Sequence, residues 1–245
     1  MERTTAGWGS GLLGVIFFSG SLPATRVAVA DLSPLFLTSA RAVIAALLGA
    51  ALLFALRQTR PARSDVGPLV VVALGVVIGF PLLTALALQH ITAAHSIVFI
   101  GLLPLATAIF GVLRGGERPR AEFWLLSTLG AATVAGFALS RSDGGSVVGD
   151  LLMVVAVLLC GLGYAEGATL SRRLGGWQVI SWALLLSLPM MAVIALFSIP
   201  VSWAGVGAPA WLSLAYVSIF SMLVGFLFWY RGLRRPLETS PIQSL

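Results

Sequence analysis

The sequence predicts an all-α fold, a polytopic bundle of transmembrane helices with eight spans in two inverted structural repeats, the second of them incomplete. Hydrophobic residues make up 58% of the 245 residues and charged residues only 10%, a balance that a soluble chain cannot bury. Apolar runs recur along the chain, each close to the length of about 20 residues that crosses a hydrocarbon core of roughly 30 Å. Arginine is concentrated in every second gap between these runs.

Each run is predicted to be a helix, because the runs are continuous and lack the alternation of a barrel strand. The alternative for the first run is a cleaved signal peptide, but Arg26 interrupts its end and the second run follows directly. In chain order the predicted spans are residues 10–29, 34–56, 67–88, 94–113, 123–139, 150–169, 177–199 and 210–230.

Prolines and glycines add detail to the third, fourth and sixth spans. Pro81 and Pro104 lie inside spans three and four, where proline kinks a helix and frees carbonyl groups. Gly-x-x-x-Gly motifs at residues 75–79 and 163–167 supply small-residue faces that allow other helices to approach closely. The fifth, seventh and eighth spans are assigned from apolar length alone.

The arginines predict the orientation. All fifteen basic residues are arginine, and the gaps after spans one, three, five and seven hold only Arg26 and Arg141. The positive-inside rule then predicts a multi-pass membrane protein with cytoplasmic N- and C-termini. The net charge of +6 is explained by these loops beside anionic lipid headgroups. Twelve arginines lie at the N-terminus or after an even-numbered span: Arg3, Arg57, Arg60, Arg63, Arg114, Arg118, Arg120, Arg172, Arg173, Arg231, Arg234 and Arg235.

The chain also contains a topological repeat. An offset of 141 residues places Gly20 on Gly161, after which spans two and three fall on spans seven and eight. A repeat of five spans contains an odd number, so its second copy enters the membrane from the opposite side. We therefore expect a first repeat of five helices at residues 7–140, an incomplete second repeat of three helices at residues 148–235, and a polar tail at residues 236–245.

Short motifs at the helix ends follow one another in a fixed order, at residues 37–41, 93–105, 116–119, 149–152 and 225–235. Examples are Leu-Thr-Ser-Ala-Arg in span two, Gly-Glu-Arg-Pro after span four and Gly-Asp-Leu-Leu at the start of span six. In order and spacing these segments resemble the EamA-type transporters of the drug/metabolite transporter (DMT) superfamily. The resemblance implies a ten-helix inner-membrane carrier of small metabolites, and therefore a truncated chain that lacks the last two helices.

Arg41 is the leading candidate for substrate binding. An ionised side chain at the centre of a membrane helix costs roughly 2.5–3.5 kcal/mol on insertion scales, so it usually faces a cavity or a partner. The helical rise places Arg41 about 10 Å below the start of span two. It is interpreted as a cation that captures an anionic group, with a structural arginine as the equal alternative.

Four further residues are candidates. His95, Tyr164 and Trp182 are predicted to contact substrate, although packing is the competing interpretation for the two aromatic residues. Glu166 is the candidate for proton coupling. Since it lies near the arginine-rich end of span six, the favoured alternative is that it extends to the lipid headgroups or pairs with Arg172 or Arg173.

Motifs of intramembrane hydrolysis and of ATP binding are absent from the sequence. We therefore expect a protein that is not an enzyme, with no catalytic residues, cofactor or metal site. The predicted function is secondary transport, as an exporter or permease, of a small metabolite or drug-like molecule by alternating access. A non-transporting membrane protein or subunit that needs a partner to complete the bundle is the alternative. The expected partners are the small-molecule substrate and the lipid bilayer, and nucleic acid is not expected. Whether the protein forms a homo-oligomer is left open by the sequence.

Overall fold

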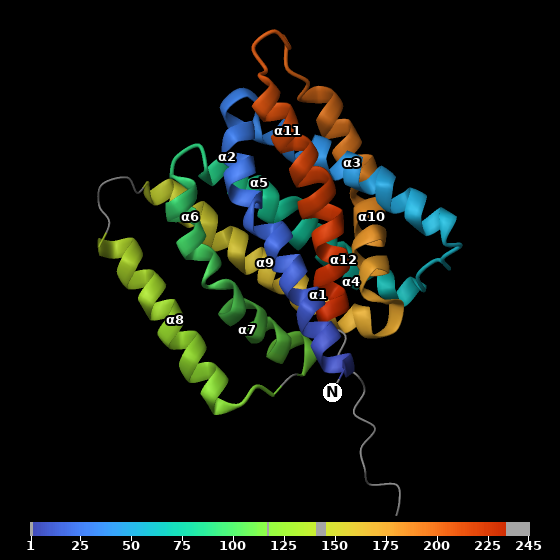
Figure 1. Ribbon diagram of the computed structural model, residues 1–245, viewed down its shortest axis with the longest axis vertical. Coiled ribbons are helices and arrows are strands. Elements are labelled where there is room, and N and C mark those ends of the chain that lie inside the picture. The colour runs from blue at the N-terminus through green and yellow to red at the C-terminus, as the bar shows by residue number, and fades with distance from the viewer. Residues whose placement is uncertain (1, 117, 141–145, 234–245) are drawn as a thin grey trace, which may run out of the picture.

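The computed structural model describes residues 2–116, 118–140 and 146–233, which form helices joined by short turns, with no strand among them (Figure 1). The expected tail at residues 236–245 lies outside these described residues. In chain order the helices are α1 (Glu2–Ser19), α2 (Ser21–Asp31), α3 (Pro34–Ala55), α4 (Arg63–Val72), the π-helical η1 (Ala73–Gly79), α5 (Phe80–Ala87), α6 (Ala93–Ile100), α7 (Leu103–Gly115), α8 (Ala121–Ser140), α9 (Val147–Leu174), α10 (Gly176–Phe197), α11 (Ala208–Tyr216), the π-helical η2 (Val217–Val224) and α12 (Gly225–Leu233).

The predicted polytopic bundle is confirmed. Seven continuous or broken helices within the described residues are long and apolar enough to cross a membrane. The 20-residue α8 accounts for the predicted fifth span. The sixth span is longer than predicted, because α9 runs for 28 residues and carries Asp150 in its first turn and Arg172 and Arg173 in its last. Charged side chains at the two ends of such a helix can extend toward lipid headgroups while its apolar centre spans the hydrocarbon.

Prolines break two spans as predicted. In span three, η1 replaces regular α-helix just before Pro81, which occupies one of the first two positions of α5. In span four, α6 ends at Ile100 and α7 begins at Leu103, directly before Pro104. Proline lacks an amide hydrogen and its ring clashes with the preceding turn, so the regular hydrogen-bond ladder cannot pass through it.

Two further spans contain interruptions that the sequence analysis did not predict. Span one is divided between α1 and α2 at Gly20, where Pro23 cannot donate a hydrogen bond to the carbonyl of Ser19. Span eight contains η2, in which the Ser218 hydroxyl donates to the Leu214 carbonyl at 2.6 Å and so competes for a backbone acceptor. Spans one, three, four and eight therefore all depart from a regular helix near their middle.

The glycine motifs do allow close helix packing, and the structure shows that the two motifs meet each other. A Cβ atom added to Gly75 would lie 2.4 Å from the carbonyl oxygen of Leu159 and 3.1 Å from the Cα atom of Gly163, so η1 crosses α9 backbone to backbone. A Cβ atom at Gly161 would likewise lie 2.8 Å from the Cβ atom of Ala106 on α7. The absence of side chains at these positions brings α9 against two neighbours at once.

The long helix α9 organises the bundle. It packs against α4, η1, α5, α7 and α10, while α3 packs along α10 and α1 packs along α12. Figure 1 shows α8 at the edge of the bundle, where it contacts α6 and α7. The interrupted span one and span eight lie beside each other, so their two irregular segments meet inside the protein.

Candidate functional site

A buried polar cluster forms where the interrupted spans meet α3. Arg41 on α3 is only 5% exposed. Its Nη2 atom donates a hydrogen bond of 3.4 Å to the Oγ atom of Ser221 in η2. Ser221 Oγ in turn lies 2.9 Å from the Oγ atom of Ser21, the first residue of α2 after the break at Gly20. We call Ser21, Arg41 and Ser221 the central cluster.

The local sequence explains how α3 delivers the guanidinium to this place. Ser33 caps the helix by accepting a hydrogen bond of 3.2 Å from the amide of Phe36, and Pro34 occupies the first turn. About two turns later the same helix reaches Arg41, between buried small residues that let α10 approach. The position of the cation is therefore held by a capped and closely packed helix.

The charge of Arg41 has no carboxylate partner among the described residues. Its Nε atom is buried and makes no hydrogen bond there. Thr38, one turn earlier on the same face of α3, and Thr84 on the neighbouring α5 also have buried hydroxyls without a partner. Four carboxylates at the span ends have other partners: Asp31 with the amide of Gly207, Asp65 with Arg173, Asp150 with His95 and Glu166 with Arg114.

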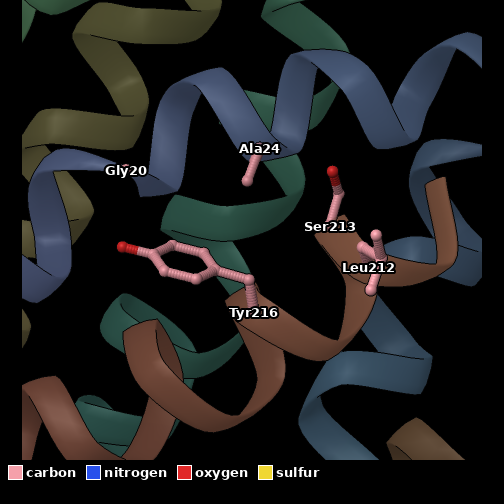
Figure 2. A pocket seen from close by; sticks show the side chains of 5 residues that line it. All are labelled: Gly20, Ala24, Leu212, Ser213 and Tyr216. Atoms are coloured by element: carbon pink, nitrogen blue, oxygen red, sulfur yellow. The ribbon is translucent and has the colours of Figure 1, made fainter. Parts of the chain in front are cut away.

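An open pocket of about 440 Å³ lies on the surface between α2 and α11 and is lined by Gly20, Ala24, Leu212, Ser213 and Tyr216 (Figure 2). The Tyr216 hydroxyl donates a hydrogen bond of 2.9 Å to the carbonyl of Phe17, so the phenol spans the break in span one. A Cβ atom at Gly20 would lie 2.5 Å from this hydroxyl. Since Ser21 follows Gly20 directly, the pocket reaches the helix break that carries one member of the central cluster.

His95 lies away from the central cluster, in the first turn of α6. It is 8% exposed, and its Nε2 atom is 2.8 Å from the Oδ1 atom of Asp150 on α9. The sequence places no carboxylate near His95, because Asp150 is 55 residues further along the chain. Within the described part of the chain, no group of three or more potential ligand side chains forms a metal site.

Glu166 pairs with a residue that the sequence did not single out. The carboxylate is 7% exposed and forms an ion pair with the Nε atom of Arg114, in the last turn of α7. Of the two expected partners, Arg173 instead has its Nη2 atom 2.7 Å from the Oδ1 atom of Asp65, an ion-pair contact without the geometry of a hydrogen bond. The close crossing of α7 and α9 at Gly161 brings Arg114 to Glu166.

Tyr164 and Trp182 occupy a packed aromatic region. The ring of Tyr164 lies 6.0 Å from the rings of both Phe226 and Trp229, measured between centroids. Trp182 packs against the same hydrophobic core, and the indole Nε1 atom of Trp229 is buried without a hydrogen-bond partner in the described chain. The structure therefore packs both candidates against one hydrophobic core, with Tyr164 beside α12, whereas His95 lies elsewhere in α6.

The sequence identified Arg41 as a candidate but not the two serines of the central cluster. Ser21 and Ser221 are 200 residues apart, and serines are common in membrane helices, so neither attracted attention alone. The signal that was available for Ser21 is its place between Gly20 and Pro23, two residues that favour a helix break.

The comparisons with known proteins agree with this architecture. The EamA-like transporter family matches residues 6–139 and 147–236. A Bacillus subtilis (strain 168) protein named "Uncharacterized transporter YdeK" is 65% identical over 233 residues, which are 95% of this chain and 81% of that protein. One solved structure shares the fold with a TM-score of 0.67 at 21% identity, covering 96% of this chain and 79% of the other. The resemblance noted in the sequence is thus confirmed, and the chain belongs to the EamA-like transporter family.

Proposed function

We propose that this membrane transporter is a gradient-driven carrier of a small metabolite or drug-like molecule, acting by alternating access. The observation that carries the proposal is the central cluster, which joins a buried cation to hydroxyls at irregular segments of spans one and eight. Secondary transporters commonly bind their substrates where helices are interrupted, because the freed backbone groups and polar side chains face a cavity there.

Two inverted repeats, at residues 7–140 and 148–235, are proposed to move against each other. The family matches the chain in two blocks with nearly these limits, which supports the division. Further support comes from the two π-helical segments, Ala73–Gly79 and Val217–Val224, because they occupy the spans that the repeat pairs with each other. Rocking of one repeat against the other would expose the central cluster to each side in turn.

The ion pairs at the ends of α9 are proposed to open and close during this movement. His95 with Asp150 joins α9 to α6 near one end, and Glu166 with Arg114 joins α9 to α7 about 24 Å further along the helix. Arg41, His95, Tyr164 and Trp182 remain the proposed substrate-binding residues, with the aromatic pair forming an apolar wall. Glu166 is the proposed proton-coupling residue.

Glu166→Gln tests the coupling role. Glutamine cannot release a proton, so this variant is expected to flatten the dependence of the transport rate on pH. The measurement is initial flux across a series of pH values in proteoliposomes. Glu122→Gln, at an exposed carboxylate in the first turn of α8, is the matched control and should retain the wild-type profile. An unchanged profile in Glu166→Gln removes this residue from proton coupling.

The proposed orientation puts both termini and the arginine-rich loops in the cytoplasm. Cysteines introduced at Arg57 and Arg172, both exposed, should react with an impermeant maleimide from the cytoplasmic side only. The native Cys160 is buried, and its replacement by alanine removes any background. Labelling of the two loops from opposite sides of the membrane contradicts the topology.

The proposed activity itself is tested by flux into vesicles that contain the purified chain. A panel of radiolabelled amino acids, organic acids and organic cations is offered with and without an imposed proton gradient, and accumulation above protein-free vesicles is expected for at least one class. A folded protein that moves none of them would contradict the carrier and support a membrane subunit that acts with a partner.

A further inference from the structure

We infer that the central cluster is an anion-binding site and that the transported molecule carries a single carboxylate, or a group of similar shape and charge, which binds Arg41. This inference rests on the proposed transport function and names the substrate class for it. Its starting point is the burial of an arginine that is 5% exposed and has no carboxylate partner in the described chain.

An isolated buried charge is unfavourable, because neither water nor a counterion offsets the loss of its hydration. Arginine retains its proton under nearly all conditions, so it does not escape this penalty by becoming neutral. The one hydrogen bond that the guanidinium makes among the described residues is the 3.4 Å contact to the neutral Ser221. A bound anion would supply the negative charge that the described residues do not.

The geometry of the free donors suits a carboxylate. Nε of Arg41 makes no hydrogen bond within the described chain, and with a terminal nitrogen it forms the planar fork that binds two carboxylate oxygens at once. The hydroxyl of Thr38 lies on the same face of α3 and is also free to donate. Ser21 and Ser221 complete a set of neutral donors that adds no further charge. A site with one cation and otherwise neutral donors favours a ligand with a single negative charge.

Among the described residues, the carboxylates at the ends of α4 and α9 are excluded from this role by their own contacts. Glu166, Asp65 and Asp150 are engaged by Arg114, Arg173 and His95 at the ends of the bundle. Apolar side chains also lie close to Arg41 along α3, where Leu37 and Ala42 are fully buried. A small organic acid with an aliphatic or aromatic body therefore suits the charge of Arg41 and these apolar neighbours.

The test measures equilibrium stabilisation of the purified full chain in lipid nanodiscs. Three anions are added separately: nitrate, which has the planar shape of a carboxylate, isovalerate and phenylacetate. Phenylacetamide and phenethylamine are the neutral and cationic controls. We expect at least one anion to raise the Tm by about 2–4 °C, which corresponds to a ligand at several times its Kd, and neither control to do so.

The variants assign the effect to the site. Arg41→Gln should lose the shift, and Arg41→Lys should keep part of it because lysine retains the charge without the planar fork. Arg57→Gln, at an exposed arginine just beyond α3, should behave like wild type. Without ligand, Arg41→Gln should unfold at the wild-type temperature or above it, whereas a structural arginine would lower that temperature.

Absence of a shift with all three anions, or a shift that persists in Arg41→Gln, overturns the inference. If Arg41→Gln fails to fold, Arg41→Lys decides the question. A Tm shift as large as that of the wild type for nitrate and for both larger acids in Arg41→Lys would contradict a fork-shaped site. The assay requires no gradient. Stabilisation without flux counts against the carrier alone, and flux without any preference for anions counts against the site alone.

Discussion

Arg41→Gln is expected to lower the flux of the transported molecule by about 10- to 150-fold at low substrate concentration, while the protein still inserts and folds. The estimate follows from the loss of a charge-assisted hydrogen bond, which contributes about 1.5–3 kcal/mol. The measurement is initial uptake in proteoliposomes at matched protein density, with insertion checked by size-exclusion chromatography and circular dichroism.

The matched control for this variant is Arg57→Gln. Arg57 is exposed in the loop after α3, and its loss should leave flux unchanged. Full retention of uptake in Arg41→Gln would remove the central cluster from the transport pathway. A parallel loss of folding in Arg41→Gln but not in Arg41→Lys would instead show that the positive charge at this position has a structural role.

Gly75→Ala is expected to destabilise the bundle by about 1–3 kcal/mol, the usual penalty for inserting a methyl group into a packed contact. The added Cβ atom would lie 2.4 Å from the Leu159 carbonyl oxygen, and a helix backbone cannot move aside as a flexible side chain can. At about 2–4 °C for each kcal/mol, the Tm should fall by several degrees. Thermal unfolding in detergent or nanodiscs measures the change.

Gly67→Ala provides the matched comparison. Gly67 lies on α4 of the same span and has nothing within 4 Å of an added Cβ atom. Alanine there should raise stability by about 0.5–1 kcal/mol, because glycine loses more conformational entropy when it enters a helix. Equal stability of the two variants would show that η1 and α9 do not cross as closely as the structure places them.

Local properties of the sequence accounted for most of the fold. The spans could be recognised because lipid requires each segment to satisfy its own backbone, so a run of apolar residues reports a helix without knowledge of its neighbours. Pro81 and Pro104 marked two interruptions for the same reason, since the missing amide acts within one helix. The distortion at Val217–Val224 contains no proline and was not predicted.

The candidate site shows where local reasoning ended. Arg41 could be singled out because an ionisable residue inside a span is costly whatever surrounds it. Arg114 could not be identified as the partner of Glu166, because the two residues are 52 positions apart and meet only through the crossing of α7 and α9. The same holds for His95 and Asp150.

By itself, the sequence determined that the chain spans a membrane as helices and where most of these helices lie. It also identified Arg41 as an ionisable residue inside a span. Tertiary structure alone decided which hydroxyls surround that cation and which ion pairs hold the ends of α9. The physical reason is that the helical hydrogen bonds are local, whereas side-chain partners depend on the angle and depth at which distant helices cross, and small residues such as Gly75 and Gly161 set those crossings through contacts with other segments.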